Sequence, residues 1–110
     1  MLKIRHNQLE ALSAANMHRF VASECERLAQ MTKSENMAIV TDARWVRAGI
    51  ESGRAYGMDS EDELARYNDL RLALGNNFPE PDDLEVLESA ELWGWQKLDE
   101  LEGRLAMASK

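Results

Sequence analysis

The sequence predicts an all-α protein, an irregular bundle of four main helices with one short extra helical turn. Ala, Leu, Glu, Arg and Met dominate the composition, β-branched residues are sparse, and the two prolines stand close together at positions 79 and 81. Apolar residues recur at steps of three and four, and no segment alternates as a half-buried strand does. A chain of 110 residues supports one modest core, so we expect a single domain over residues 1–110.

The first helix is expected from about Asn7 to Met31, because apolar residues repeat along it with helical spacing. These residues are Leu9, Leu12, Met17, Phe20, Val21, Leu28 and Met31. A capping box from Thr32 to Glu35 is expected to start a second helix. That helix should run to Tyr56 with four residues on its buried side: Ile39, Ala43, Val46 and Ile50.

Three glycines recur at four-residue spacing towards the end of this second helix: Gly49, Gly53 and Gly57. A glycine inside a helix costs about 1 kcal/mol relative to alanine, so a packing gain must offset the first two. We therefore expect a flat groove that lets a neighbouring helix approach closely. Gly57 is expected to end the helix in a left-handed turn.

A third helix is expected to follow the acidic cap at residues 59–63 and to end near Leu74. Its buried side should hold Leu64, Tyr67, Leu70 and Leu74. Residues 75–81 contain a glycine and both prolines and are expected to form a loop, with Pro81 opening a short helical segment. Ser89 is expected to cap a last helix whose apolar repeat is Leu92, Trp95, Leu98, Leu101 and Leu105.

The charges are unevenly distributed along the chain. Residues 1–58 carry eight Lys/Arg and six Asp/Glu, whereas residues 59–110 carry five and fourteen, so the net charges are +2 and −9. The acidic half repels a phosphate backbone, which argues against a nucleic-acid partner. It suits a basic protein surface, although a set of solvated helix faces is the simpler interpretation. No apolar run is long enough for a membrane span or a signal peptide, and Cys25 is the single cysteine, so we expect a soluble cytoplasmic protein.

Residues suited to chemistry are few and poorly placed. His18 and Cys25 lie about 10 Å apart along one expected helix, too far for one zinc ion, and His6 stands near the terminus. The acidic run at residues 59–63 lacks the turn glycine and the distal glutamate of a calcium loop. No phosphate-binding loop, nucleophile elbow or metalloprotease motif occurs. We therefore expect no metal, no cofactor and no enzymatic activity.

Three arginines form a short basic stripe on the expected second helix. Arg44, Arg47 and Arg54 are spaced by three and seven residues, so they share one side of the helix. Asp42 and Glu51 lie beside them, so internal salt bridging is the alternative to a partner or anion site.

Tryptophan is the other residue type that marks candidate binding surfaces, because tryptophan and arginine are enriched at interface hot spots. On a helix Trp93 and Trp95 would point about 160° apart, so only one can enter the core fully. Periodicity places Trp95 in the core and leaves Trp93 for a partner, with partial burial under the loop at residues 79–81 as the alternative. The candidate partner-binding residues are therefore Arg44, Arg47, Arg54, Trp45 and Trp93.

Three stretches resemble a family of small helical bacterial proteins encoded beside type VI secretion effectors, their spike proteins and their adaptors. The first is the opening Ile4-Arg5-His6-Asn7-Gln8-Leu9-Glu10, followed by Phe20. The second is the arginine-glycine-isoleucine helix Val46-Arg47-Ala48-Gly49-Ile50-Glu51-Ser52-Gly53-Arg54-Ala55-Tyr56-Gly57. The third runs from Ser60 to Phe78 and contains Arg66-Tyr67 and Leu74-Gly75.

The resemblance covers most of residues 4–78 and implies a genomic setting rather than a set of site residues. It implies an adaptor, co-adaptor or chaperone that binds an effector or its loading protein. The alternative is an immunity protein that neutralises a cognate toxin, in which case the acidic half of the chain would sit in a basic active-site cleft. The identity of the protein partner and the oligomeric state stay open.

Overall fold

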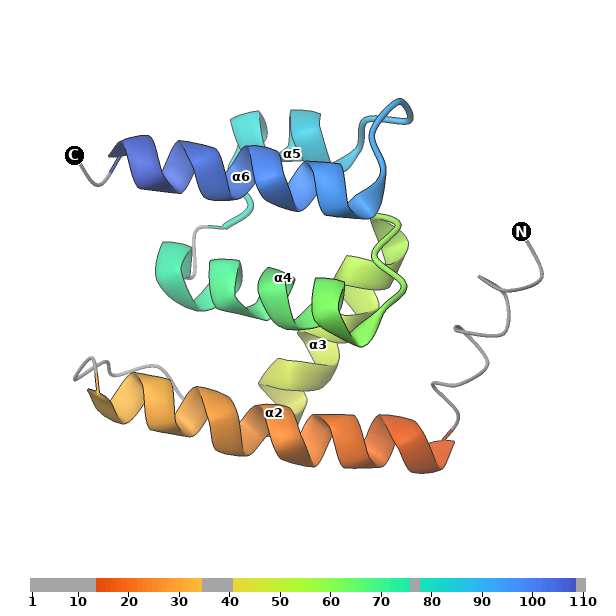
Figure 1. Cartoon of the computed structure of the whole chain (residues 1–110), viewed down its shortest axis with the longest axis vertical. Helices are drawn as coiled ribbons and strands as arrows, with labels where there is room; N and C mark the ends of the chain where they lie inside the picture. The colour runs from red at the N-terminus through yellow and green to blue at the C-terminus, as the bar shows by residue number, and fades with distance from the viewer. Residues whose placement is uncertain (1–13, 35–40, 76–77, 109–110) are drawn as a thin grey trace.

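The structure is a computed structural model that describes residues 14–34, 41–75 and 78–108. This part of the chain is all-α, as predicted, and comprises α2 (Ala14–Ser34), α3 (Ala43–Ala55), α4 (Glu61–Leu74), α5 (Pro81–Leu87) and α6 (Gly94–Ala108). Helices α2, α4 and α6 lie in three successive tiers, and α3 crosses from α2 towards the start of α6 (Figure 1). The short helix α5 packs against α6. None of these helices is both long enough and apolar enough to cross a membrane.

The core lies where α4 meets the helices around it. Its fully buried side chains include Leu28 of α2, Val46 of α3, Leu64 and Tyr67 of α4, and Leu98 of α6. The Tyr67 ring packs at 6.2 Å from that of Tyr56 and at 5.7 Å from that of Phe78, measured between centroids. The core therefore draws on segments from both ends of the described chain.

The expected capping box at Thr32 is wrong. Helix α2 continues through Thr32 to Ser34, and the Thr32 hydroxyl donates to the carbonyl of Ala29 at 2.9 Å. A threonine can bond back to its own helix in this way instead of capping a new one. Glu35 and the expected core residue Ile39 lie outside the described residues.

Helix α3 takes its start from Asp42, whose side chain accepts from the Trp45 amide at 3.0 Å. The predicted second helix therefore begins later than expected, and Ala43 is exposed rather than buried because it occupies the first position of α3. Val46 and Ile50 are buried, as predicted.

The glycines of α3 allow a neighbouring helix to approach closely, as predicted from their spacing. A side-chain carbon at Gly49 would collide with Asn68 Oδ1 and Arg71 Nη1, and one at Gly53 would lie 2.8 Å from Leu64 Cδ2. All three of those residues belong to α4, so the glycines allow α4 to approach the backbone of α3. Gly57 then ends the segment with a positive φ of 93°.

The acidic cap before α4 also forms as predicted. The Ser60 hydroxyl accepts from the Glu63 amide at 3.1 Å, and Glu63 Oε1 accepts from the Ser60 amide at 3.2 Å. The helix ends at Gly75, which has a positive φ of 78°. Leu64, Tyr67 and Leu70 are buried, as predicted, whereas the terminal Leu74 is half-buried.

Two expectations about the last helix are wrong. Ser89 does not cap it, because α6 begins at Gly94 and the Ser89 hydroxyl accepts from the Glu91 amide. Trp95 is not a core residue, since 49% of it is exposed. Gly94 occupies the core-facing position of the first turn, where a side-chain carbon would lie 2.7 Å from the carbonyl oxygen of Gly57. The start of α6 thus packs backbone against backbone, which leaves no room there for an indole.

Candidate partner-binding surface

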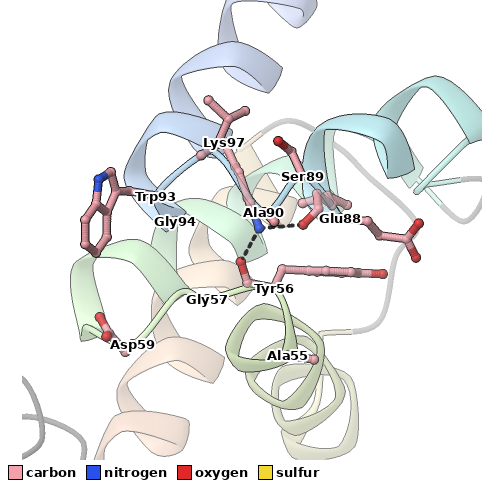
Figure 2. A pocket seen from close by; sticks show the side chains of 12 residues that line it. Ala55, Tyr56, Gly57, Asp59, Glu88, Ser89, Ala90, Trp93, Gly94 and Lys97 are labelled. Carbon is pink, nitrogen blue, oxygen red and sulfur yellow. Dashed lines mark hydrogen bonds between the residues drawn. The ribbon is translucent and has the colours of Figure 1, made fainter.

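The C-terminal ends of α3 and α5 and the start of α6 border an open hollow of about 690 Å³ (Figure 2). We call it the Trp93 hollow. Its lining residues are Ala55, Tyr56, Gly57, Asp59, Leu87, Glu88, Ser89, Ala90, Leu92, Trp93, Gly94 and Lys97. Figure 2 shows Trp93 and Asp59 on one side and Glu88 on the other, with Lys97 between them. The hollow therefore combines aromatic walls with charged groups of both signs.

Lys97 joins the elements that form the hollow. It is 6% exposed, and its ammonium group donates to the carbonyl oxygens of Tyr56 at 2.8 Å and Leu87 at 2.6 Å. These carbonyls stand at the ends of α3 and α5, where helices carry unpaired acceptors and partial negative charge. Burial lowers the pKa of Lys97 below its ordinary value. Lys97 thus acts as a cross-link between two helix ends and α6.

Trp93 is fixed at its backbone and exposed at its side chain. Its amide donates to Gln96 Oε1 at 2.9 Å, and its carbonyl accepts from the Lys97 amide at 3.0 Å. The residue is nevertheless 56% exposed. The predicted position outside the core is therefore confirmed, and a binding partner would meet an indole on an ordered turn.

Trp45 is engaged within the protein. It is half-buried, the Arg71 guanidinium lies 3.8 Å from its ring centroid, and Arg71 Nη1 donates to its carbonyl at 2.7 Å. Burial lowers the pKa of Arg71, so the guanidinium is held in a partly desolvated site between α3 and α4.

The three candidate arginines of α3 are exposed. Arg47 and Arg54 line a second hollow of about 330 Å³ together with Met17 of α2, Ile50 and Glu51. This second hollow and the Trp93 hollow share no lining residue. The structure thus brings Arg47 and Arg54 together on one surface, places Trp93 on another, and leaves Trp45 packed against α4.

Neither His18 nor Cys25, the two residues weighed for metal binding in the sequence, lines the Trp93 hollow or the second hollow. His18 is exposed, and burial followed by the carboxylates of Asp42 and Glu24 raises the pKa of the Cys25 thiol, which disfavours the nucleophilic thiolate. Across residues 14–34, 41–75 and 78–108, no group of three or more His, Cys, Asp or Glu side chains is placed to hold a metal ion. His6 lies outside these ranges.

Sequence reasoning missed Lys97, although a signal for it was present. Leu98, Leu101 and Leu105 define the inner face of α6, and Lys97 lies one turn before Leu101 on that same face. A lysine on an apolar helix face indicates a buried amine that requires carbonyl or carboxylate partners.

In comparisons with known proteins, no family model matches the chain, and neither a curated protein nor a solved structure shows significant similarity to it.

Proposed function

We propose that this chain is a protein-binding accessory factor of type VI secretion. In this role it acts in the cytoplasm as an adaptor, co-adaptor or chaperone and binds an effector or its loading protein before export. The resemblance of residues 4–78 supports the setting. The role requires no reaction, cofactor or metal.

The exposed indole of Trp93 is the observation that carries the proposal. Aromatic side chains at binding surfaces bury on the order of 150–250 Å² each and dominate interface energetics. Trp93 stands beside a hollow, and hydrogen bonds already hold its backbone in place. Binding through it would therefore require little ordering of the free protein, which favours affinity.

Arg47 and Arg54 supply a second anchor in the proposal. Both are exposed and share the second hollow with the apolar Met17 and Ile50 and with Glu51. An arginine next to apolar surface can contribute both its stem and its fixed array of donors to a partner.

Affinity capture of tagged protein from producing cells tests the proposal. Mass spectrometry should identify an effector, adaptor or spike protein encoded by neighbouring genes. Replacement of a hot-spot side chain costs 2 kcal/mol or more, so Trp93→Ala should weaken binding by about 30-fold, and Arg47→Ala by a smaller factor.

The matched control is Trp95→Ala, which removes an equally large and similarly exposed indole from outside the Trp93 hollow. Circular dichroism should show all three variants to be helical. The proposal fails if no secretion component is captured, or if Trp93→Ala and Arg47→Ala both capture as much as the unaltered protein.

A second candidate, an immunity protein, is favoured by the acidic surface of α5 and α6. Residues 81–108 carry eight Asp/Glu and two Lys/Arg, a net charge of −6. The exposed carboxylates are those of Asp82, Glu85, Glu88, Glu91, Asp99 and Glu100. Such a surface complements a basic active-site cleft. Cells that express this chain alone would then survive the cognate toxin, whereas the accessory role predicts effector capture without protection.

A further inference from the structure

Arg47 and Arg54 present exposed guanidinium groups on one side of α3. In the part of the chain that the structure describes, neither arginine forms an ion pair with a carboxylate. The Asp42 side chain accepts from the Trp45 amide at the start of α3, and Glu51 forms no ion pair among the described residues. Internal salt bridging, the alternative interpretation of the arginine stripe, therefore does not account for these two charges.

An apolar side chain lies between these two charges along α3. Ile50 is three residues after Arg47 and four before Arg54. It lines the second hollow together with both arginines and with Met17 of α2. The aliphatic stem of an arginine adds to the apolar surface beside it. The hollow of about 330 Å³ therefore has room for one branched apolar side chain near two guanidinium groups.

Glu51 restricts what can lie between the two arginines. It is exposed, and it lines the same hollow one residue after Ile50. A carboxylate placed above Glu51 would meet a like charge, whereas one beside Arg47 or Arg54 would meet a guanidinium group. Two acidic groups with an uncharged apolar group between them therefore match the hollow better than a continuous acidic run does. A nucleic-acid backbone, which carries a charge at every phosphate, matches it less well for the same reason.

The spacing of the two arginines favours a helix as the bound element. Seven residues of α3 rise by about 10 Å. On a partner helix, two residues seven apart also lie about 10 Å apart on one face, so each could meet one arginine. On an extended strand, residues of one face recur about every 7 Å, so pairs at about 7 and 14 Å miss that spacing.

We propose that the second hollow binds an amphipathic helix of the partner protein, which places a carboxylate at Arg47 and another at Arg54. An apolar side chain between these carboxylates packs over Ile50 and Met17. Amphipathic helices bind other proteins in this way, through side chains three, four and seven residues apart. This inference rests on the proposed function, because it specifies the chemistry of the surface that the effector or its loading protein presents.

Three synthetic peptides test this chemistry directly. The first, acetyl-KAAEAALAAAEAAK-amide, carries two glutamates with a leucine between them at the required spacing. The second has glutamine in place of both glutamates, and the third has glutamate in place of the leucine. Each is titrated into the ¹⁵N-labelled full chain while the Nε–H groups of Arg47 and Arg54 and the backbone amides of residues 47–54 are followed by NMR. The first peptide should bind saturably in about the millimolar range, and each of the others at least about threefold more weakly.

Matched variants locate the effect. Arg47→Gln and Arg54→Gln should each weaken binding of the first peptide about threefold. Arg19→Gln should not change it, because Arg19 is an exposed arginine that points about 160° away from Met17 on α2. Circular dichroism should show all three variants to be helical. Equal binding of the glutamate and glutamine peptides, tighter binding of the third peptide, equal effects of all three variants, or no binding of any probe would each overturn the inference.

The free protein reveals whether something else occupies the second hollow. Arg47 and Arg54 signals that shift with protein concentration would indicate a second copy of this chain. Nuclear Overhauser contacts from residues 1–13 to Ile50 would indicate that the chain fills the hollow itself. Either result would overturn the inference.

The peptide titration and the affinity capture can fail separately. If Arg47→Ala weakens capture of a secretion component while the first peptide does not bind, the accessory role stands and the acidic helix is wrong. If the first peptide binds as expected but no secretion component is captured, the second hollow has the proposed chemistry and the proposed function fails.

Discussion

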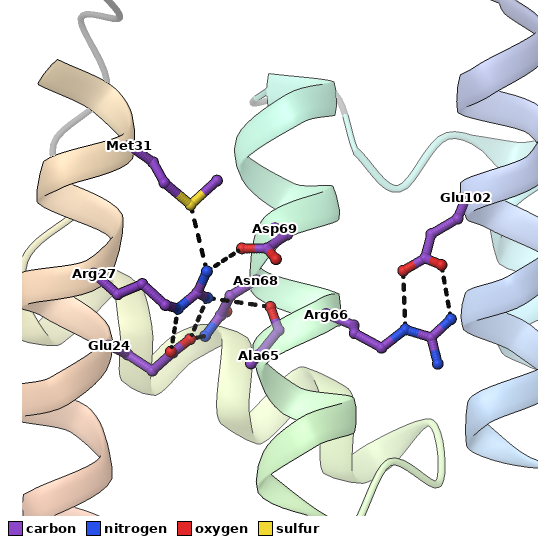
Figure 3. Close-up of polar contacts among 8 residues, drawn as sticks. All are labelled: Glu24, Arg27, Met31, Ala65, Arg66, Asn68, Asp69 and Glu102. Carbon is purple, nitrogen blue, oxygen red and sulfur yellow. Dashed lines mark hydrogen bonds and ion pairs between the residues drawn. The ribbon is translucent and has the colours of Figure 1, made fainter. Parts of the chain in front are cut away.

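Two arginine–carboxylate contacts lie on either side of α4 (Figure 3): Arg27 and Glu24 are three residues apart on α2, whereas Arg66 of α4 pairs with Glu102 of α6. Arg27 makes a two-pronged contact with Glu24 at 2.8 and 2.9 Å, and Arg66 makes one with Glu102 at 3.0 and 2.7 Å. The two arginine side chains are similarly exposed, at 36% and 33%. The carboxylates are not, because the Glu24 side chain is 4% exposed and that of Glu102 is 42% exposed. The pairs therefore share a bidentate contact, and they differ in the burial of the carboxylate and in whether the contact joins two helices.

The other residues that bond to each pair also differ in burial. Glu24 also accepts from Asn68, which is fully buried on α4, and Arg27 reaches across to Asp69 of α4 at 2.8 Å. Arg66 bonds instead to Asp99, whose side chain is 59% exposed. A hydrogen bond with Glu24 raises the pKa of Arg27, and one with Glu102 raises the pKa of Arg66. Both arginines are therefore protonated, and their charge does not distinguish the two pairs. The burial of the carboxylate should decide how much each contact matters to stability.

Arg27→Ala is expected to have the largest effect, because it leaves the Glu24 carboxylate buried without its cation. Removal of one member of a buried pair costs about 3–5 kcal/mol. Arg27 is partly exposed and water can reach its place, so we expect a loss of about 2–3 kcal/mol in the free energy of unfolding. Urea denaturation followed by circular dichroism measures it. The double variant Glu24→Gln/Arg27→Ala should recover more than half of this lost free energy. The glutamine oxygen at position 24 can still accept from Asn68, and no charge is left buried.

Alkaline pH tests the buried side of α4 through Tyr67. Burial, followed by the nearby Tyr56, raises the pKa of Tyr67 from 10.0 to about 12. Because the folded-state pKa is the higher one, stability is fully present below pH 10 and is lost between pH 10 and 12, by about 2 kcal/mol. Lys97 contributes with the opposite sign, because its lowered pKa makes stability rise as pH approaches the ordinary lysine value.

Comparison with Tyr67→Phe isolates the tyrosine contribution, because that variant retains Lys97. The measurement is the free energy of unfolding in urea at pH 8 to 12. The difference between the two proteins should be constant up to pH 10 and then shift in favour of the variant. A difference that stays constant to pH 12 would mean that Tyr67 ionises as readily in the folded protein as in the unfolded one.

Gly49→Ala tests the close contact between α3 and α4. The added carbon would displace Asn68 Oδ1 and Arg71 Nη1, which bond to each other at 3.0 Å, while Arg71 also holds the Trp45 carbonyl. Overpacking costs about 1–3 kcal/mol, and alanine returns up to about 1 kcal/mol of helix propensity, so we expect a net loss of about 1–2 kcal/mol. Gly103→Ala on α6 is the matched control. A carbon there meets nothing within 4 Å, so thermal unfolding should show a gain of about 0.5–1 kcal/mol.

Features of the fold that depend on neighbouring residues could be predicted from the sequence. The cap formed by Ser60 and Glu63 and the glycine that ends α3 are local signals with few structural alternatives. Thr32 was misleading because its hydroxyl can either cap a new helix or bond back to the carbonyl of Ala29 within α2, as it does here. Trp95 was misleading because its spacing of three residues from Leu98 fits a helical repeat, whereas Gly94, four residues before Leu98, takes the inward position of the first turn.

The candidate site was harder to predict because its contacts span the chain. The sequence predicted Trp93 outside the core only by placing Trp95 inside it, whereas about half of each tryptophan is exposed. The bond from Lys97 to the Tyr56 carbonyl joins residues 41 positions apart, and that from Asn68 to Glu24 joins residues 44 apart. No local pattern specifies such pairs, because each depends on how the helices are placed once they have formed.

Arg66→Ala is expected to have the smallest effect and tests the comparison most directly. The variant removes as many arginine contacts to carboxylates as Arg27→Ala does. However, Asp99 and Glu102 are exposed enough for water to solvate their carboxylates once the arginine is removed. Exposed pairs contribute about 0–1 kcal/mol, so we expect a loss below 1 kcal/mol in urea denaturation, which shrinks further in 1 M salt as screening increases. The loss from Arg27→Ala should persist in salt, because Glu24 is shielded from solvent ions. Equal losses for the two variants would mean that the burial of the carboxylate does not set the strength of these contacts, and that the bidentate geometry they share does.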